Sequence, residues 1–340
     1  MLFEGLKKLL YALGLLAIYH RLRNAHTLTV VMFHRVLDPT DVRWAGSDMD
    51  FTLRADIFDD CLRFFVRHYN IVPVSEVLAA RRGQHVLPPR ALLITFDDGW
   101  ADNVDHALPR LQSHGLPGLI FVVANAVDRR QPFFQERIVN AWLRGRLSLD
   151  RLAFAVAEQD EDFNPIEETG VLGIRVMISR IERLQAARRE AVLQALEIEL
   201  HDSLTHMVSS LQLRKLAACG VEVGAHGMTH DPLPDSKDLE VELVGARSAL
   251  AAHLGDGEPP IALSFPHGRF DPHVVAKALA AGYELLFTSL PVLNLLQTKP
   301  STPLLGRVGI SSQAVTDEKG RFRPERLALR LFRRPRGVLG

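Results

Sequence analysis

The sequence has few cysteines, no net charge and no long apolar run, and each of these absences excludes some classes of protein. Only two cysteines occur, Cys61 and Cys219, so neither a disulfide framework nor a CxxC metal site is expected, and a reducing compartment is favoured. Forty basic and forty acidic residues cancel, which argues against nucleic acid as a partner. The apolar run at 9–19 is shorter than the roughly 20 residues of a membrane-spanning helix. What remains is a chain of 340 residues, 47% of them hydrophobic, that can bury a sizeable core.

The two ends of the chain combine basic residues with apolar residues at helical spacing. Residues 1–25 mix leucines with four basic residues, and residues 321–340 carry seven arginines and one glutamate. No small-residue cleavage site follows the first segment, so a cleavable signal peptide is not predicted. One interpretation is an amphipathic helix in peripheral contact with an anionic membrane, and the other is an ordinary helix packed on the domain. We expect a protein in the cytoplasm or on the inner face of the membrane.

Between these ends, short β-branched runs alternate with helical patterns. The predicted strands are 28–34, 70–75, 91–96, 118–124, 221–226, 261–267, 284–289 and 304–310. The predicted helices are 54–69, 100–115, 238–255 and 271–283. An order of strand then helix predicts an α/β fold with a mostly parallel sheet or barrel.

One long segment interrupts the alternation of strands and helices, and it defines the predicted domain organisation. Residues from about 130 to 215 have a helical pattern without a strand, and we interpret them as a helical insertion. The predicted parts are an amphipathic helix at 1–25, a main domain at 26–320 that carries this insertion, and a basic tail at 321–340.

The sequence TFDDG at 95–99 places two adjacent carboxylates directly after a predicted strand. The carboxyl ends of parallel strands are where such folds place their chemistry. Asp97 and Asp98 would repel each other there, which is tolerable if a cation binds one and the other holds or relays a proton. The alternative is a helix N-cap followed by a turn glycine, because DDGWADN also opens a predicted helix.

A second motif, GAHGMTH at 224–230, follows another predicted strand. Both imidazoles of His226 and His230 can reach one ion at this spacing, although two surface histidines on one helical face are common. One carboxylate and two histidines form a frequent coordination set that leaves room for water. Together with a strand-end aspartate pair, the motif favours a metal site.

These two motifs and the segment SFPHGRFDPHVVAKALAAGYELLFT at 264–288 resemble the polysaccharide deacetylases, the carbohydrate esterases with the NodB homology domain. VVMFHRV at 30–36 is similar to the early YHRV-type strand of that family, and FPHGRFD at 265–271 is similar to its YPYG-type loop. The order and spacing match through most of the chain outside the insertion. The resemblance implies a distorted (β/α) barrel of the NodB type with a helical insertion.

The same resemblance implies roles for individual residues. The ligands of a divalent metal would be Asp98, His226 and His230. Zinc is favoured by this donor set, although iron, cobalt and nickel suit the same donors. Asp97 would be the general base that takes a proton from the attacking water. A substrate loop, with the His267 N–H helping to stabilise the oxyanion, would consist of Pro266, His267 and Gly268.

Two features depart from the family pattern. No histidine follows His273, so the general acid that usually comes late in the chain is missing. In a branch resembling the poly-N-acetylglucosamine deacetylases the acid comes from the first strand, where His34 matches; the alternative is a structural histidine in a weak or inactive relative. Ser264 stands where many relatives have an arginine that orients the base. Arg307, at the end of another predicted strand, could substitute for it, or could form a salt bridge or a surface charge.

The predicted function is metal-dependent hydrolysis of an N-acetyl or N-formyl group on an amino sugar of a polysaccharide or a lipid-linked glycan. Two alternatives stay open: an esterase or non-sugar amidase on the same scaffold, and a non-catalytic glycan-binding relative. The presence of both aspartates and both histidines weakens the second alternative. Trp100 could stack on a sugar ring, although aromatic residues more often pack in the core.

Overall fold

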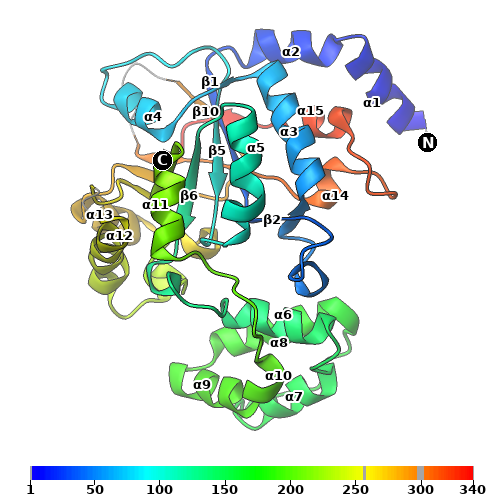
Figure 1. The fold of residues 1–340 in the computed structure, drawn as a ribbon, viewed down its shortest axis with the longest axis vertical. Coiled ribbons are helices and arrows are strands. Elements are labelled where there is room, and N and C mark those ends of the chain that lie inside the picture. The colour runs from blue at the N-terminus through cyan, green and yellow to red at the C-terminus, as the bar shows by residue number, and fades with distance from the viewer. Residues whose placement is uncertain (1, 256–257, 297–301, 340) are drawn as a thin grey trace. The chain divides into compact units, whose positions relative to one another are not determined.

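The structure is a computed structural model that describes residues 2–255, 258–296 and 302–339 (Figure 1). The chain forms two compact units. The first comprises 1–38, 50–129 and 207–340, and the second comprises 39–49 and 130–206. The strands of the central sheet belong to the first unit, and the second unit is helical.

The first unit is built around a sheet with the strand order β11-β9-β8-β7-β6-β5-β1-β10-β13. Off this path, β4 pairs with β5 and β12 pairs with β1. Among the strand pairs of the described residues, only β1 and β10 run antiparallel. The bounds are β1 Thr27–Phe33, β4 Asn70–Ile71, β5 Ala91–Phe96, β6 Gly118–Val122, β7 Val221–Ala225, β8 Ala262–Ser264, β9 Leu285–Phe287, β10 Leu293–Leu295, β11 Leu304–Leu305, β12 Val308–Gly309 and β13 Arg336–Gly337. A separate small sheet pairs β2 (Arg35–Leu37) with β3 (Thr52–Arg54).

A short segment of chain joins distant strands of this sheet. β11 pairs with β9, β12 pairs with β1, and only Gly306 and Arg307 separate β11 from β12. Asn294 stabilises this seam, because its side-chain N–H groups donate to the carbonyls of Leu28 and Gly306 and its oxygen accepts from the Gly306 N–H. The sheet therefore curls into a distorted barrel, and the predicted mostly parallel α/β class is confirmed.

Both faces of the sheet are buried, which explains the continuous apolar runs of its strands. In β5, the alternate residues Leu92, Ile94 and Phe96 pack in a cluster that includes the surrounding helices, whereas Leu93 packs in a second cluster. That second cluster combines residues from β1, β5, β6, β8, β9 and β11. One apolar core thus lies inside the curl of the sheet and another lies between the sheet and the helices.

Helices lie beside the sheet in the first unit (Figure 1). They are α3 Ala55–His68, α4 Val74–Arg81, α5 Leu108–Ser113, α11 Ser210–Ala218, α12 Ala246–Leu254, α13 Pro272–Ala280 and α14 Ser312–Val315. A π-helical turn precedes α5 at 103–107 and α12 at 241–245. The strand predicted at 70–75 is wrong beyond residue 71, because Pro73 has no N–H for a sheet ladder and α4 begins directly after it.

The second unit has a hydrophobic core of its own. Its helices are α6 Phe134–Leu143, α7 Leu149–Ala157, α8 Gly170–Arg183, α9 Ala186–Ala195 and α10 Glu197–Leu200. Arg175 on α8 forms an ion pair of 2.8 Å with Asp48, which ties residues 39–49 to these helices. The unit ends at residue 206 rather than at about 215, because Ser209 caps α11 and Leu213 and Leu216 of α11 pack in the core of the first unit.

The terminal segments belong to the first unit. The single helix predicted within 1–25 is two helices, α1 (Leu2–Ala12) and α2 (Leu15–Arg23), separated at Gly14, whose φ of 73° is left-handed. The predicted basic tail contains α15 (Pro324–Phe332) and β13, which pairs with β10. None of the described helices is long and apolar enough to cross a membrane.

A neutral imidazole holds α2 against α15. His20 is buried, and its ring stacks on Phe332 with centroids 4.0 Å apart. The side-chain N–H of Asn24 donates to His20 Nδ1 at 3.0 Å, which requires that this nitrogen carry no proton. Burial lowers the pKa of His20 to about 3, so protonation opposes this packing.

We predict that His20 makes the protein less stable in mild acid. Its folded pKa is about 3, whereas the unfolded chain takes up a proton near 6.5, so stability is lost as pH falls from about 6.5 towards 3. When the pH is lowered from roughly 7.5 to 5, the free energy of unfolding in urea should fall in both proteins. The fall should be about 2 kcal/mol smaller in His20→Phe than in the wild type. The exposed His201, replaced by Phe, is the control. An unchanged pH dependence in His20→Phe would contradict the prediction.

Candidate active site

The carboxyl ends of neighbouring strands bring the sequence motifs to one edge of the sheet. In the parallel pair β1–β5, Phe33 lies opposite Phe96, so His34 and Asp97 follow at the same level. The Asp97 N–H donates to the Phe33 carbonyl at 2.9 Å. His226 follows the end of β7, two strands from β5. The sheet thus assembles residues that are far apart in the chain.

A left-handed turn sends the two adjacent carboxylates in different directions. Asp98 has a φ of 78° and Gly99 a φ of 84°. A β-carbon at Gly99 would lie 3.0 Å from Val122 Cγ1, so this second position favours glycine. The backbone conformation of Asp98 is uncommon for a residue with a side chain. In this conformation the Asp98 carboxylate contacts His226, His230 and Trp100.

Asp98, His226 and His230 form a group whose ligand atoms all lie within 4.8 Å of one another. Asp98 Oδ1 is 3.4 Å from His226 Nε2 and 3.3 Å from His230 Nε2. His226 Nδ1 is 2.8 Å from the Ser264 carbonyl, which can only accept, so Nδ1 carries a proton and Nε2 is the nitrogen that faces Asp98. A carboxylate oxygen and an oriented imidazole nitrogen are ligands that fit a divalent metal, which would replace the proton on that nitrogen.

The charges of this group favour an ionised Asp98. Burial acts to raise the pKa of Asp98, but its hydrogen bonds to His226 and His230 outweigh burial and hold that pKa well below the usual range. Burial acts to lower the pKa of His226, and the carboxylates of Asp98 and Asp97 reverse this and raise it. The anionic carboxylate that a metal requires is therefore the favoured form of Asp98.

Asp97 is held by a buried arginine from the seam of the barrel. Arg307 donates to Asp97 through Nη1 at 2.6 Å and Nη2 at 2.8 Å, and both side chains are almost fully buried. Arg307 Nη2 also donates to Ser264 Oγ at 2.7 Å, and Nε donates to the Thr288 carbonyl at 3.1 Å. Burial acts to raise the pKa of Asp97, but the Arg307 charge outweighs it and lowers that pKa. Asp97 is therefore an oriented carboxylate, and Arg307 forms a buried salt bridge with it and also donates to Ser264, so it is not a surface charge.

His34 stands near both carboxylates. It directly follows β1, at the level of Asp97 after β5, and its charge, when protonated, lowers the pKa of Asp97 and of Asp98. The ring packs edge-on against Phe51, with centroids 5.1 Å apart. His34 itself is half-buried, so it is partly accessible to solvent. This position is compatible with proton donation to a bound ligand.

The loop predicted to line the substrate lies against the histidine motif. His267 has a φ of 56°, and its Nε2 donates to the His230 carbonyl at 3.1 Å. The two rings lie 4.7 Å apart. Gly268 has a φ of 66°, and a β-carbon there would overlap Ser289 Oγ, so this position requires glycine. Pro266, His267 and Gly268 form one turn beside His230.

The structure places three buried residues, Trp100, Arg35 and Asp102, around Asp98, and the sequence did not predict their role. Trp100 is 1% exposed, so it cannot stack on a sugar; instead its indole N–H donates to Asp98 Oδ2 at 2.9 Å. The Arg35 guanidinium lies 4.3 Å from the centre of the Trp100 ring and donates to Asp102 at 2.9 Å. Arg35 and Asp102 are both buried. Their signal was available, since Arg35 lies within the VVMFHRV segment and Asp102 follows the TFDDG motif by three residues.

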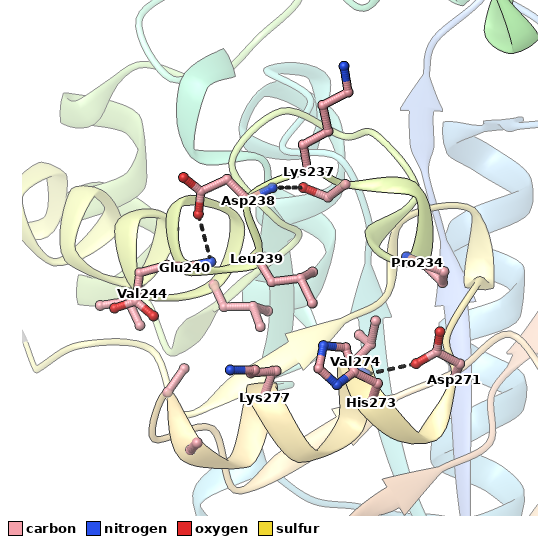
Figure 2. Close-up of a pocket in the computed structure, with 14 residues that line it drawn as sticks. Pro234, Lys237, Asp238, Leu239, Glu240, Val244, Asp271, His273, Val274 and Lys277 are labelled. Atoms are coloured by element: carbon pink, nitrogen blue, oxygen red, sulfur yellow. Dashed lines mark hydrogen bonds between the residues drawn. The ribbon is translucent and has the colours of Figure 1, made fainter.

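A pocket of about 470 Å³ in the first unit does not contain this site. Residues within 234–244 and 271–281 line it, and Figure 2 shows His273 and Lys277 on α13 beside Leu239. Its lining does not include Asp98, His226 or His230. The pocket is therefore distinct from the candidate metal site.

A family model for polysaccharide deacetylases matches residues 85–170 and 184–286. The chain belongs to the polysaccharide deacetylase family. The match contains Asp97, Asp98 and both histidines of the GAHGMTH motif, whereas His34 and Arg307 lie outside it. No curated protein matches the sequence.

Solved structures, a polysaccharide deacetylase among them, share the fold of this chain. The deacetylase PplD of Streptococcus pyogenes, solved in complex with acetate, is 14% identical over 90% of this chain and 98% of its own, with a TM-score of 0.57. IcaB from Ammonifex degensii is 17% identical over 90% and 97%, with a TM-score of 0.57. A polysaccharide deacetylase from Bacillus cereus is 15% identical over 90% and 69%, with a TM-score of 0.56. At these identities the similarity establishes the fold.

We predict that Arg307 stabilises the fold through Asp97. In metal-free protein, Arg307→Met should cost about 3–5 kcal/mol in denaturant unfolding, because it leaves a buried carboxylate without its partner. Adding Asp97→Asn should recover much of that loss. Arg82→Met is the matched control, since Arg82 pairs with Glu284 at the surface and should contribute less than about 1 kcal/mol. Equal losses in the two arginine variants would contradict the prediction.

Proposed function

We propose that this protein is a metal-dependent hydrolase that removes an N-acetyl or N-formyl group from an amino sugar of a glycan. One observation carries the proposal: an oriented, ionised Asp97 lies beside the metal-compatible group of Asp98, His226 and His230 in a chain of the polysaccharide deacetylase family. Neither a general base nor a metal group alone would distinguish amide hydrolysis from other chemistry. Their combination supports attack of water on an acyl carbon.

The metal would be held by Asp98 Oδ1 and the Nε2 atoms of His226 and His230. A divalent cation bound there would polarise the acyl oxygen and lower the pKa of water. Zinc is the first metal to test, given two imidazoles and one carboxylate, and iron, cobalt and nickel are the next. Trp100 would keep Asp98 in place by its hydrogen bond to Oδ2.

Asp97 would act as the general base. Its two oxygens accept from Arg307, which fixes the plane of the carboxylate and keeps it ionised until the reaction begins. In the reaction it would accept a proton from water as the new carbon–oxygen bond forms. The backbone N–H of His267 would stabilise the negative charge that develops on the acyl oxygen.

His34 would act as the general acid. Breaking the carbon–nitrogen bond releases an amine, which is a poor leaving group unless the nitrogen receives a proton. His34 follows β1 at the level of Asp97 and is half-buried, which would leave its ring within reach of a bound amide. The products would be acetate or formate and the free amino sugar.

The direct test is release of acetate by the metal-loaded protein from N-acetylglucosamine oligomers. We expect free amines and acetate to appear in equal amounts, and little acetate from O-acetylated glycans without N-acetyl groups. Preference for the O-acetylated glycan would indicate an esterase instead. Binding of either glycan without release of acetate would indicate a non-catalytic relative.

We predict that substitutions separate the metal ligands from the base. Asp98→Ala, His226→Ala and His230→Ala should each lose bound metal and activity together, because a three-ligand site tolerates loss of one ligand poorly. Asp97→Asn should keep its metal while turnover falls by about 10² to 10⁴. Elemental analysis and acetate release are the measurements, and the exposed His273, replaced by Ala, is the control. Full metal content in Asp98→Ala would remove the proposed site.

We predict that His34→Ala impairs amide hydrolysis selectively. Turnover of an N-acetylated substrate should fall by roughly 10² to 10⁴, because the departing amine then lacks a proton donor. An activated ester, whose leaving group needs no proton, should lose much less, and metal content should stay unchanged. Equal losses on amide and ester would make His34 structural.

A further inference from the structure

The most unusual surface of the first unit is an apolar stripe along α1 and α2. On α1 and in the link that follows, the exposed large residues are Leu6, Leu9 and Leu13. On α2 they are Leu15, Ile18, Tyr19 and Leu22. Leu22 is 79% exposed and Leu13 is 62% exposed. A single exposed leucine is ordinary, but seven exposed large apolar residues on successive turns of two adjoining helices mark a candidate interaction surface.

The opposite faces of the same helices are already docked on the domain. Leu16 and His20 of α2 are buried, and Leu10 and Tyr11 of α1 pack against the main core. The stacking of His20 on Phe332 fixes the rotation of α2. The stripe is therefore the face of α1 and α2 that does not pack on the domain. Rotating either helix to bury the stripe would expose the apolar residues that are now buried.

Basic side chains lie at the margins of the stripe. Lys8 and Arg21 are exposed, and helical spacing places Lys8 about 100° around its helix from Leu9 and Arg21 about 60° from Ile18. The only acidic side chain of residues 2–25, Glu4, is paired with Lys7 at 2.7 Å and with Arg326 at 3.5 Å. The stripe thus has an apolar centre with positive margins.

The basic end of the chain adds to this charge because it is held beside α2. Arg23 donates to the carbonyls of Phe332 and Arg334, and Arg336 donates to the carbonyl of Arg23. The exposed Arg333 and Arg336 therefore lie near the stripe. Residues 1–25 and 321–340 hold eleven of the forty basic residues of the chain and only two of its forty acidic residues.

We propose that the stripe docks the protein on the surface of an anionic lipid bilayer. The apolar side chains would enter the boundary between headgroups and acyl chains, and the arginines and lysines would contact anionic headgroups. The helices would lie in the plane of the surface, since none of those described can cross it. A neutral protein partner would account for the leucines but not for the concentration of basic residues in a chain of zero net charge.

The same placement leaves the candidate active site away from the lipid. α2 ends at Arg23 and β1 begins at Thr27, so α2 lies at the amino end of β1, as Figure 1 shows. The site follows the carboxyl ends of β5 and β7, and the six residues of β5 span about 20 Å. Docking and glycan hydrolysis can therefore be tested separately, and the docking proposal does not depend on the proposed function.

The test is co-sedimentation of the full chain with vesicles. Phosphatidylcholine vesicles that contain about one third phosphatidylglycerol should bind the protein, and pure phosphatidylcholine vesicles should bind it much less. Added salt should weaken the binding. Leu9→Asp with Leu22→Asp should lower the partition coefficient by at least roughly tenfold. Lys8→Glu with Arg21→Glu should lower it by about tenfold on the anionic vesicles alone.

The matched control is Ile198→Asp with Leu211→Asp, two residues that do not belong to the stripe and are 90% and 71% exposed. This variant should bind as the wild type does, and circular dichroism should show that every variant is folded. Absence of binding to anionic vesicles, or an equal loss in the control, would overturn the proposal. A dimer in solution that Leu9→Asp with Leu22→Asp dissociates would also overturn it, because a second copy of the chain would then cover the stripe.

Discussion

The ion pair between Arg307 and Asp97 links the closure of the sheet to the chemistry at its edge. Arg307 lies in the two-residue connection that joins β11 to β12, and its guanidinium reaches the carboxylate that follows β5. A buried pair is tolerable only when its remaining hydrogen-bonding groups are also satisfied, and Thr288 and Ser264 accept from the same guanidinium. The curl of the sheet is therefore what allows Asp97 to be charged in the interior.

The two adjacent aspartates are compatible because they face different partners. Asp97 continues the direction of β5 toward Arg307, whereas the left-handed backbone of Asp98 turns its carboxylate toward His226 and His230. Each negative charge is thus met by nearby donors, which lower both pKa values even though both residues are buried. One short motif thereby supplies two carboxylates in different environments, as acid–base catalysis beside a metal requires.

The two proposed activities occupy different parts of the first unit. The candidate active site lies where strands end, and the apolar stripe lies on the helices that lead into the first strand. His20 and Asn24 hold those helices to α15 by packing and hydrogen bonds that are unrelated to the site. Surface docking and glycan hydrolysis can therefore change independently.

The sequence by itself determined the features that depend on local pattern. Strand-length apolar runs predicted β1, β5, β6 and β7, and the motifs at 95–99 and 224–230 predicted the residues of the metal-compatible group. Only the tertiary structure decided that Arg307, 210 residues after Asp97, orients that carboxylate, and that the Trp100 indole bonds to Asp98 instead of facing a sugar. It also decided that residues 39–49 join the helical unit and that the first helical segment breaks at Gly14. Periodicity reports which side of an element is buried, whereas the partner of a buried charge depends on how the whole sheet closes.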